Sequence, residues 1–209
     1  MSTAKKIEPP AGHLPVMEHF YSVQGEGAYA GVPAYFIRLA GCDVGCTWCD
    51  VKESWTAGED QLVSIDALCN EVRKSNAPVV VVTGGEPLMY DLTELTKKLQ
   101  AVQVRTHLET SGAHPLSGIW DWICVSPKRF KKPLSEILPR ADELKCIIAH
   151  PNDLRFAEEY VAQANAYCRL LLQAEWEKRD EMYALISNYV LQNPKWSISM
   201  QTHKYMGLP

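Results

Sequence analysis

Short, continuous apolar runs alternate with helical patterns along the sequence. This alternation restricts the possible folds of the chain more than any other feature. Several runs are rich in β-branched residues, as buried parallel strands are. Strands that alternate with helices favour a parallel α/β sheet built from right-handed βαβ units. The expected strands are Val16–Phe20, Ala34–Leu39, Val79–Val82, Val104–Leu108, Trp122–Val125, Leu144–Ile148, Cys168–Leu172 and Trp196–Met200.

Four segments between these runs have the pattern of helices, and Ser64 and Asp91 are N-cap candidates for the first two. The 209 residues are short for a complete eight-unit barrel, which typically has ~250. We therefore expect an α/β fold, namely a partial, open (β/α)6-type barrel with reduced helices. The expected helices are Ile65–Ser75, Leu92–Gln100, Leu154–Ala164 and Glu181–Leu191.

Composition indicates one catalytic domain over residues 14–209, after a polar tail, residues 1–13, that we expect to be disordered. A hydrophobic content of 46% and a charged content of 22% are usual for a globular protein. The net charge of −4 does not indicate the basic surface that nucleic-acid-binding proteins have. No apolar run reaches the ~18 residues of a membrane span, and the first residues lack the apolar core of a secretory signal. We expect a cytoplasmic protein with no nucleic-acid or membrane partner.

Polar motifs directly follow the apolar runs. They begin at Thr83, Glu109, Ser126, Gln173 and Gln201. Active sites of β/α barrels and open α/β sheets lie at the C-terminal ends of the strands. Polar residues are common at loop starts in any protein, so one motif alone would carry little weight. Several motifs in equivalent positions, together with a cysteine cluster, indicate one shared site.

Three cysteines, Cys42, Cys46 and Cys49, are clustered in the loop Gly41–Asp50, among an odd total of 7. An odd count in a chain of this size argues against a disulfide framework. Thiolate is a soft ligand for zinc or iron–sulfur clusters, and a [4Fe-4S] cluster normally takes four cysteines. Three ligands would leave one iron open to a substrate or cofactor. The remaining cysteines are expected to be small buried hydrophobes, and they are Cys69, Cys124, Cys146 and Cys168.

Two interpretations of the cysteine cluster involve no catalysis. A zinc-stabilised interaction module would need a fourth ligand, and the nearest histidines in the sequence are His19 and His107. A non-catalytic iron–sulfur electron carrier would need a fourth protein ligand to the cluster and would bind no cofactor.

The pattern Cys42-x-x-x-Cys46-x-Trp48-Cys49, followed by Gly-Gly-Glu-Pro at residues 84–87, resembles the signatures of the radical S-adenosylmethionine (SAM) superfamily. In that superfamily, the amine and carboxylate of SAM chelate the open iron. The resemblance therefore implies two cofactors, a [4Fe-4S] cluster on the three cysteines and SAM.

Four further stretches, residues 21–27, 36–42, 121–128 and 199–209, resemble the 7-carboxy-7-deazaguanine synthase family. The resemblance implies a radical carbon–nitrogen lyase of queuosine or other deazapurine biosynthesis. The reaction is the ring contraction of 6-carboxy-5,6,7,8-tetrahydropterin with loss of ammonia. A radical derived from SAM takes hydrogen from carbon 6 of the pterin, and SAM is regenerated. A glycyl-radical-enzyme activase of the same superfamily is the alternative.

The resemblance and the side-chain chemistry together assign residues to two ligands. Positions expected to bind SAM are Trp48, Gly84, Gly85, Glu86, Glu109, Ser126, Pro127, Lys128, Gln173, Ala174, Glu175 and Trp176. Positions expected to bind the substrate are Val23, Gln24, Gly25, Arg38, Thr83 and Pro209.

Roles differ within these sets. Arg38 is expected to clamp the substrate carboxylate, because a guanidinium pairs bidentately with a carboxylate; a surface ion pair is the alternative. Gly84 and Gly85 are expected to let the backbone approach the SAM ammonium, since glycine has no Cβ. Glu26 and His203 are candidates for acid/base or orienting roles.

Two residues depart from the family pattern. Val51 stands where the family commonly has a threonine whose hydroxyl helps to bind Mg²⁺, an ion that demands oxygen ligands. We therefore expect a weakened Mg²⁺ dependence, with Arg38 or Lys52 supplying positive charge. Ala174 stands where the family often has proline, which fixes φ. The expected partners are the pterin, a flavodoxin or ferredoxin as electron donor, and a second copy of the chain that covers the open side of the barrel.

Overall fold

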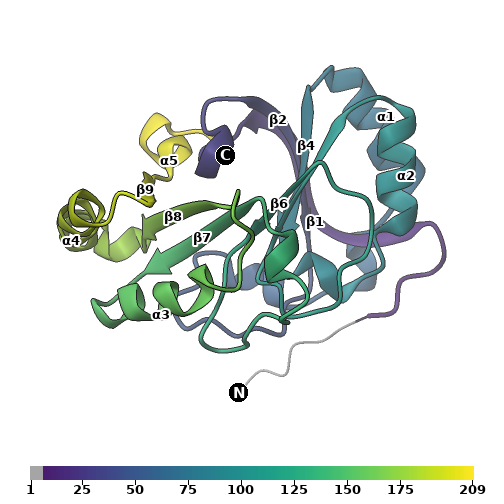
Figure 1. Ribbon diagram of the computed structural model, residues 1–209. Coiled ribbons are helices and arrows are strands. Elements are labelled where there is room, and N and C mark those ends of the chain that lie inside the picture. The colour runs from purple at the N-terminus through teal and green to yellow at the C-terminus, as the bar shows by residue number, and fades with distance from the viewer. Residues whose placement is uncertain (1–6) are drawn as a thin grey trace.

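The computed structural model describes residues 7–209 as a single nine-stranded sheet with helices on its outer face (Figure 1). The strands are β1 (His13–Val23), β2 (Pro33–Leu39), β3 (Leu62–Ser64), β4 (Val79–Gly84), β5 (Arg105–Thr110), β6 (Trp122–Val125), β7 (Glu143–Ile148), β8 (Arg169–Ala174) and β9 (Trp196–Ser199). The α-helices are α1 (Ile65–Ser75), α2 (Thr93–Ala101), α3 (Asn152–Val161), α4 (Arg179–Gln192) and α5 (Thr202–Met206).

The sheet is an open barrel with the order β3-β1-β2-β4-β5-β6-β7-β8-β9. Every pairing from β2 to β9 is parallel. The strands β3 and β9 are the two edges, so the barrel does not close. The prediction of a partial, open α/β barrel is confirmed.

The first strand corrects one detail of the prediction. β1 is longer than the expected Val16–Phe20, and it runs antiparallel to both β2 and β3. Parallel neighbours need a crossover of about a dozen residues or more, and the segment between Val23 and Pro33 is too short for one. β1 and β2 therefore pair as neighbours in a hairpin-like arrangement, and the parallel order begins only at β2.

The tail predicted to be disordered lies partly within the described residues. Residues 1–6 lie outside them. Further along, the Gly12 carbonyl accepts a hydrogen bond of 2.8 Å from the Ile65 backbone N–H, and His13 already begins β1. The tail is therefore joined to the start of α1.

The helices follow their predicted capping residues. α1 has the predicted bounds, and its N-cap Ser64 accepts a hydrogen bond of 3.1 Å from the Ala67 backbone N–H. Asp91 accepts one of 2.9 Å from the Thr93 backbone N–H at the start of α2. Figure 1 shows α1 and α2 side by side on one half of the sheet, with α3 and α4 on the other.

The core lies between the helices and the outer face of the sheet. Leu39, Leu68, Leu95, Leu108 and Leu144 have no exposed surface, and burying a leucine side chain contributes about 2 kcal/mol. Among the dispersed cysteines, Cys69, Cys124 and Cys146 are buried as predicted, whereas Cys168 is only half-buried against the core edge. Over residues 7–209, no helix has the length and apolar character to cross a membrane.

We expect the substitution Ser64→Ala to lower the free energy of unfolding by about 1 kcal/mol, because α1 would lose its N-cap acceptor. Ser64→Asp, which keeps an acceptor, should stay close to the wild type. Equilibrium urea unfolding of the three proteins measures both effects. Equal losses for alanine and aspartate would contradict the capping role.

Candidate active site

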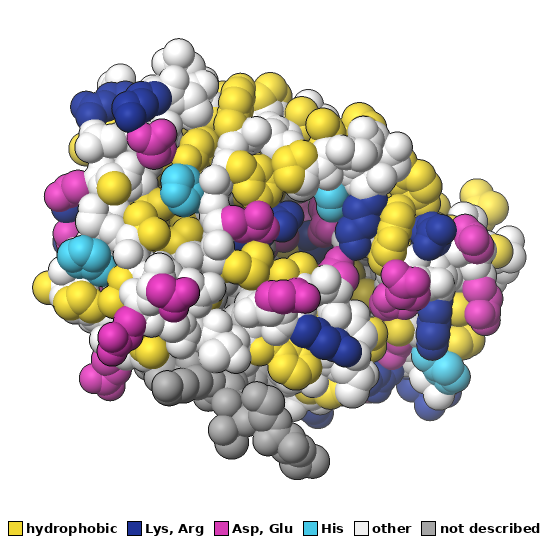
Figure 2. Space-filling view, turned by 180° about the vertical axis from the view of Figure 1, so that it is seen from behind, with side chains coloured by type: hydrophobic (Ala, Val, Ile, Leu, Met, Phe, Trp, Pro, Cys, Tyr) yellow, Lys and Arg dark blue, Asp and Glu magenta, His cyan; other side chains and the backbone are white. Residues whose placement is uncertain are grey.

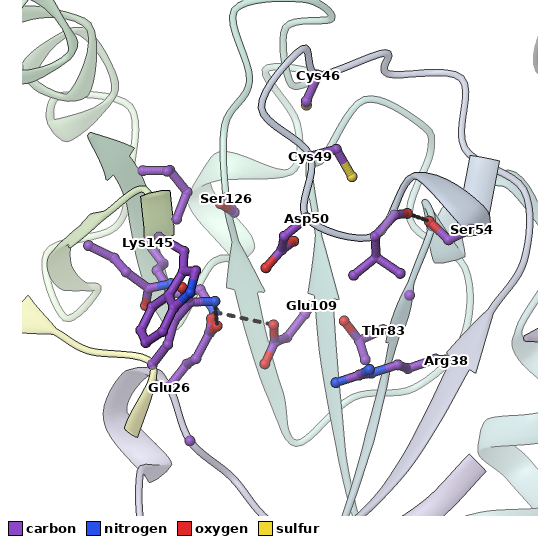
Figure 3. Close-up of a pocket in the computed structure, with 18 of the residues that line it drawn as sticks. Glu26, Arg38, Cys46, Cys49, Asp50, Ser54, Thr83, Glu109, Ser126 and Lys145 are labelled. Atoms are coloured by element: carbon purple, nitrogen blue, oxygen red, sulfur yellow. Dashed lines mark hydrogen bonds and ion pairs between the residues drawn. The ribbon is translucent and has the colours of Figure 1, made fainter. Parts of the chain in front are cut away.

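A cavity of about 450 Å³ opens at the C-terminal ends of the parallel strands. In the space-filling view, one face of the molecule is hollowed at its centre, and basic and acidic side chains lie on the wall of the hollow (Figure 2). Every predicted site residue lines the cavity except Pro127. Figure 3 shows Cys46 and Cys49 on one side and Glu26, Glu109 and Lys145 on the other. The structure therefore brings the predicted residues into one site.

The cysteine loop is anchored through its backbone. The Gly41 N–H donates to the Ser54 carbonyl at 2.7 Å, and the Cys42 N–H donates to the Trp55 carbonyl at 3.2 Å. Gly41 has φ of +96°, and a Cβ there would lie 2.3 Å from the Tyr90 hydroxyl. Only glycine fits such a position, because the left-handed region and the close contact both exclude a side chain. The first cysteine is thus held at a fixed point at the end of β2.

The three thiols line the cavity wall. Burial raises the pKa of the Cys42 thiol and raises that of Cys46 to about 11, and the nearby Cys49 contributes to both increases. Such thiols must lose protons to become metal ligands, so cluster binding has to be coupled to proton release. Cys42, Cys46 and Cys49 are free thiols on one loop that line a cavity with room for another ligand, and this donor set fits a [4Fe-4S] cluster with one open iron. Among residues 7–209 no three such side chains are already arranged to hold a metal ion, so binding of the cluster would bring the thiols together.

The two glycines of the Gly-Gly-Glu-Pro motif line the cavity and are closely packed on the backbone behind it. A Cβ on Gly84 would lie 2.4 Å from the backbone N and O of Leu39, and a Cβ on Gly85 would lie 2.2 Å from the Gly41 carbonyl oxygen. The glycines let the end of β4 pack directly on the end of β2, and the Glu86 N–H donates to the Gly41 carbonyl at 2.9 Å.

Glu86 orders the loops around the cysteines. Its side chain is 1% exposed and accepts hydrogen bonds from the backbone N–H groups of Ser111 at 2.8 Å and Leu88 at 3.1 Å. The hydroxyls of Thr110 and Ser111 donate to it as well. Four donors thus satisfy this carboxylate, and through them it connects the loop after β4 to the loop after β5.

A lysine that the sequence analysis missed lies below the cavity. Lys145, on β7, is 3% exposed and forms ion pairs with Glu26 and, at 3.2 Å, with Glu109. Gln24 donates to Glu109 at 2.9 Å, and Gln201 donates to Glu26 at the same distance. We call Lys145, Glu26, Glu109, Gln24 and Gln201 the polar floor; Figure 3 labels Lys145, Glu26 and Glu109. The only sequence signal was a lysine inside an apolar strand run.

Electrostatics fix the charges of the polar floor. Burial alone would raise the pKa of Glu26, but the Lys145 ammonium and hydrogen bonds from Lys145, Gln201 and Gln173 lower this pKa to about 2. Burial would lower the pKa of Lys145, but Glu109 and Glu26 raise it well above its usual value. Both groups are therefore charged at neutral pH. Glu26 then accepts hydrogen bonds, and this favours an orienting role over acid/base catalysis.

Arg38 forms an ion pair and also lines the cavity. Its Nη1 forms an ion pair of 2.7 Å with Glu18, and the guanidinium lies 5.0 Å from the centre of the Phe20 ring. It also lines the cavity, next to Thr83, its register partner on β4 (Figure 3). Glu18 holds the guanidinium in position at the cavity wall.

The C-terminal segment, residues 201–209, covers the cavity from the side of β9. The Thr202 N–H donates to the Gly25 carbonyl at 2.9 Å, and a Cβ on Gly25 would lie 2.1 Å from His203 Nδ1. Lys204 forms an ion pair of 2.6 Å with Asp50 of the cysteine loop. Pro209 lines the cavity as predicted. Burial lowers the pKa of His203, so this imidazole is neutral at neutral pH.

The SAM positions after β6 and β8 also converge on the cavity. Lys128 donates to the Ser126 carbonyl at 3.0 Å, and its ammonium lies 5.6 Å from the centre of the Trp48 ring. Gln173 is buried and accepts a hydrogen bond of 2.6 Å from the Ser199 hydroxyl. The Glu175 side chain accepts one of 3.1 Å from the Glu177 N–H, so the turn after Ala174 is held without proline.

Val51 offers no side-chain oxygen at the position where the family pattern has threonine. Its carbonyl accepts hydrogen bonds from Ser54, at 2.7 Å from the hydroxyl and 3.1 Å from the backbone N–H. The adjacent Asp50 carboxylate is paired with Lys204. Val51 thus supplies no side-chain oxygen, and one of the two Asp50 carboxylate oxygens is paired with Lys204, so this segment offers fewer oxygen ligands for Mg²⁺ than the family pattern does.

Comparisons with known proteins agree with this site. Residues 36–125 match the Radical SAM superfamily. The chain is 52% identical to a 7-carboxy-7-deazaguanine synthase of Flavobacterium psychrophilum, over 94% of this chain and 93% of that protein. It is 47% identical to one of Synechocystis, over 93% of each chain. The crystal structure of QueE from Escherichia coli superposes with a TM-score of 0.81 at 34% identity, covering 92% of this chain and 96% of that one.

The depressed pKa of Glu26 predicts a pH-dependent contribution to stability. The pKa falls from the usual 4.5 to about 2 on folding, so the ionised form stabilises the folded state above pH 4.5, and this stabilisation is lost as the pH falls toward 2. We expect Glu26→Gln to lower the free energy of unfolding by about 2 kcal/mol at neutral pH. Urea unfolding at several pH values should show this difference shrinking toward pH 2, and a constant difference would refute the ion pair.

Proposed function

The chain belongs to the 7-carboxy-7-deazaguanine synthase family of radical SAM enzymes, and on this premise we propose that it contracts the ring of 6-carboxy-5,6,7,8-tetrahydropterin to give 7-carboxy-7-deazaguanine. Ammonia leaves in the reaction, and the product feeds queuosine or another deazapurine. The observation that carries the proposal is that a wall of three thiols and a charged polar floor face each other across one cavity.

The residues divide the cavity between two ligands. Cys42, Cys46 and Cys49 hold the cluster, and Trp48 and Lys128 lie where the rest of SAM would extend. When bound, the cluster and SAM supply the radical that removes hydrogen from the substrate. The protein contributes the fixed loop, the burial and the orientation of the pterin against that centre.

The polar floor suits the pterin. A pterin has an amide and an amino group on one edge, which need acceptors and donors at fixed positions. The ionised Glu26 accepts hydrogen bonds, while Gln24 and Thr83 provide further polar groups. Arg38 pairs with the carboxylate, for which a guanidinium is the best-matched side chain. A volume of about 450 Å³ lies within the usual range for small-molecule sites.

The carboxylate is bound with little help from Mg²⁺. Val51 lacks the side-chain oxygen that the ion would need, its carbonyl accepts hydrogen bonds from Ser54, and one oxygen of Asp50 is paired with Lys204. Arg38 supplies positive charge at the cavity wall, whereas Lys52, the other candidate, is exposed and does not line the cavity.

Two partners complete the proposal. An electron donor such as a flavodoxin or ferredoxin reduces the cluster, and a second copy of the chain covers the open side of the barrel. The second copy is supported by β9, an edge strand with exposed Ile198 and Met200 beside it, because such edges are usually covered. The enzyme acts in the cytoplasm. The names of the relatives favour this reaction over the activase and the electron carrier.

The proposed reaction is tested by anaerobic incubation of the reconstituted protein with SAM, dithionite and the tetrahydropterin. Mass analysis should find 7-carboxy-7-deazaguanine and ammonia. A cluster-loaded protein that cleaves SAM but leaves the pterin unchanged would overturn the proposal in favour of a different substrate.

We expect Arg38→Ala to raise KM for the tetrahydropterin by about 100-fold and Arg38→Lys by about 10-fold, because lysine keeps the charge but loses the bidentate geometry. Steady-state kinetics measures both. Glu18→Gln removes the ion pair that positions the guanidinium but keeps the guanidinium itself, so it should raise KM less than Arg38→Ala does. Equal effects of Arg38→Ala and Glu18→Gln would mean that Arg38 has only a structural role.

The metal prediction is tested with the pair of wild type and Val51→Thr. After treatment with EDTA, turnover of the wild type should respond weakly to added Mg²⁺, whereas Val51→Thr should gain a saturable activation, because it restores an oxygen ligand. Saturable activation of the wild type would refute the prediction.

A further inference from the structure

A second, small cavity lies inside the barrel beneath the polar floor. Its volume is about 10 Å³, which is enough for one molecule the size of water. Gln24, Glu26 and Glu109 line both this cavity and the large one, so these side chains form the partition between the two. We call the small cavity the lower cavity. A molecule in it is separated from the substrate pocket by one layer of side chains.

The lower cavity is lined by the same strands that carry the polar floor, two residues earlier in each. His107 precedes Glu109 on β5, and Glu143 precedes Lys145 on β7. Side chains two positions apart on a strand point to the same side of the sheet. His107 and Glu143 line the lower cavity but not the large one. The inside of the barrel is therefore polar at two successive levels, and only the upper level contacts the substrate pocket.

His107 is the first group that indicates a ligand in the lower cavity. It is 3% exposed, and its Nε2 is buried with no hydrogen-bond partner among residues 7–209. Burial, helped by Arg105 and opposed by Asp121, lowers the pKa of this imidazole to about 4, so it is neutral at neutral pH. With its proton on Nδ1, a neutral imidazole has an acceptor at Nε2. Buried polar atoms without a partner are rare, so this nitrogen calls for a small molecule with an N–H or O–H donor.

Glu143 is the second such group. It is 2% exposed and accepts a hydrogen bond of 2.9 Å from the Ala28 N–H, and the Cys124 thiol lies 3.4 Å from its Oε1. The ammonium of Lys145 is paired with two other carboxylates, and no cation among residues 7–209 forms an ion pair with Glu143. Burial raises the pKa of this carboxyl group. A carboxyl group in such a place is stabilised by keeping its proton or by binding a cation.

The other walls of the lower cavity also favour a cation. Two carboxylates of the polar floor share the single ammonium of Lys145, and Glu143 adds a third carboxyl group. The rings of Tyr29 and Trp122 complete the lining, and an aromatic face attracts a cation. Arg105 lies 5.4 Å from the centre of the Tyr29 ring, which leaves the Trp122 ring for this contact. A small cation with hydrogen-bond donors thus matches the lining better than a water molecule does.

Given the proposed function, in which ring contraction releases ammonia, we propose that the lower cavity binds that product as ammonium. Ammonium is close to water in size and has four N–H donors. The Nε2 atom of His107 and the Glu143 carboxylate accept two of them, and the carboxylates of the partition line the same cavity. Potassium has a similar size and the same charge, but it cannot donate a hydrogen bond to an imidazole nitrogen.

The nitrogen leaves the pterin as ammonia and gains one proton in the lower cavity. The Glu143 carboxyl group supplies this proton, so a carboxylate and an ammonium ion form side by side and no net charge is created. No other bond forms or breaks in this step. Ammonium has no lone pair and cannot add back to the product. Because Tyr29 and Trp122 are only half-buried, the ion can leave to solvent at their end of the barrel without crossing the substrate pocket again.

Binding is tested on the cluster-loaded protein without SAM or pterin, by its thermal unfolding in three chloride salts at equal ionic strength. We expect ammonium to raise the unfolding midpoint by about 3 °C relative to potassium, because a ligand that binds only the folded state stabilises it. Methylammonium, which is too large for the lower cavity, should give the same midpoint as potassium. Equal midpoints in ammonium and potassium would overturn the proposal and assign the lower cavity to water or to monovalent cations in general.

Two variants test the location of the ion, each compared with itself in potassium so that a loss of stability alone does not imitate the effect. Glu143→Gln keeps an acceptor for the Ala28 N–H but loses the charge, and His107→Leu removes the imidazole acceptor. Both should lose the ammonium-specific shift. Glu136→Gln is the matched control, because Glu136 is exposed and does not line the lower cavity; it should keep the shift. A shift that persists in both variants would contradict the site.

Turnover gives an independent measurement, since a bound product inhibits. Ammonium chloride should inhibit ring contraction by the wild type, and the inhibition constant should be about 10-fold higher for Glu143→Gln, which loses a charged acceptor. Equal inhibition constants would overturn the site. The thermal shift needs no pterin, so its absence in a protein that contracts the ring would overturn the ammonium site and leave the proposed function standing. An ammonium-specific shift in a protein that leaves the pterin unchanged would support the site and refute the proposed function.

Discussion

A single buried ammonium, that of Lys145, determines how the floor of this site is built. Removing such a charge from water costs several kcal/mol unless it is paired and hydrogen-bonded, and Lys145 meets this requirement only by contacting Glu26 and Glu109. Those carboxylates come from the segment after β1 and from β5, so one lysine joins three parts of the chain. Gln201 extends the network to the last segment through Glu26. The position of β1 and the closure of the cavity over the last residues both depend on this network.

The side of the cavity that carries Cys42, Cys46 and Cys49 is held in place differently, by close contact between backbone segments. Gly84 and Gly85 occupy positions where a Cβ would meet backbone atoms of Leu39 and Gly41 at 2.2–2.4 Å, so the ends of β2 and β4 join without side chains between them. Glu86 then ties the loop after β4 to the loop after β5. A rigid wall of thiols and a charged floor thus face each other, and a cluster-bound cofactor and a polar substrate can meet only in the space between them.

The sequence predicted most of this fold and much of the site, for reasons that are local. The strands β2 and β4 to β9 were recognisable because buried parallel strands are continuous apolar runs, and α1 was recognisable because Ser64 caps it; β3, a short antiparallel edge strand, was missed. The antiparallel direction of β1 follows from the short connection between β1 and β2. The pattern of hydrophobic residues does not indicate strand direction. Lys145 was missed because its partners lie more than thirty residues away in sequence. It also lies within a strand whose sequence is mostly apolar, so it was counted as part of that strand. The close packing of Gly84 and Gly85 on the end of β2 could not be predicted either, since these contacts are tertiary.

The central claim is that one cavity presents carbon 6 of the pterin to the centre formed by the three cysteines and SAM. It is tested most directly by turnover of substrate that carries deuterium at carbon 6, followed by mass analysis of the SAM recovered afterwards. The account predicts deuterium in the recovered SAM, because the hydrogen is exchanged between the two ligands within the cavity. Formation of 7-carboxy-7-deazaguanine with no deuterium in SAM would contradict it.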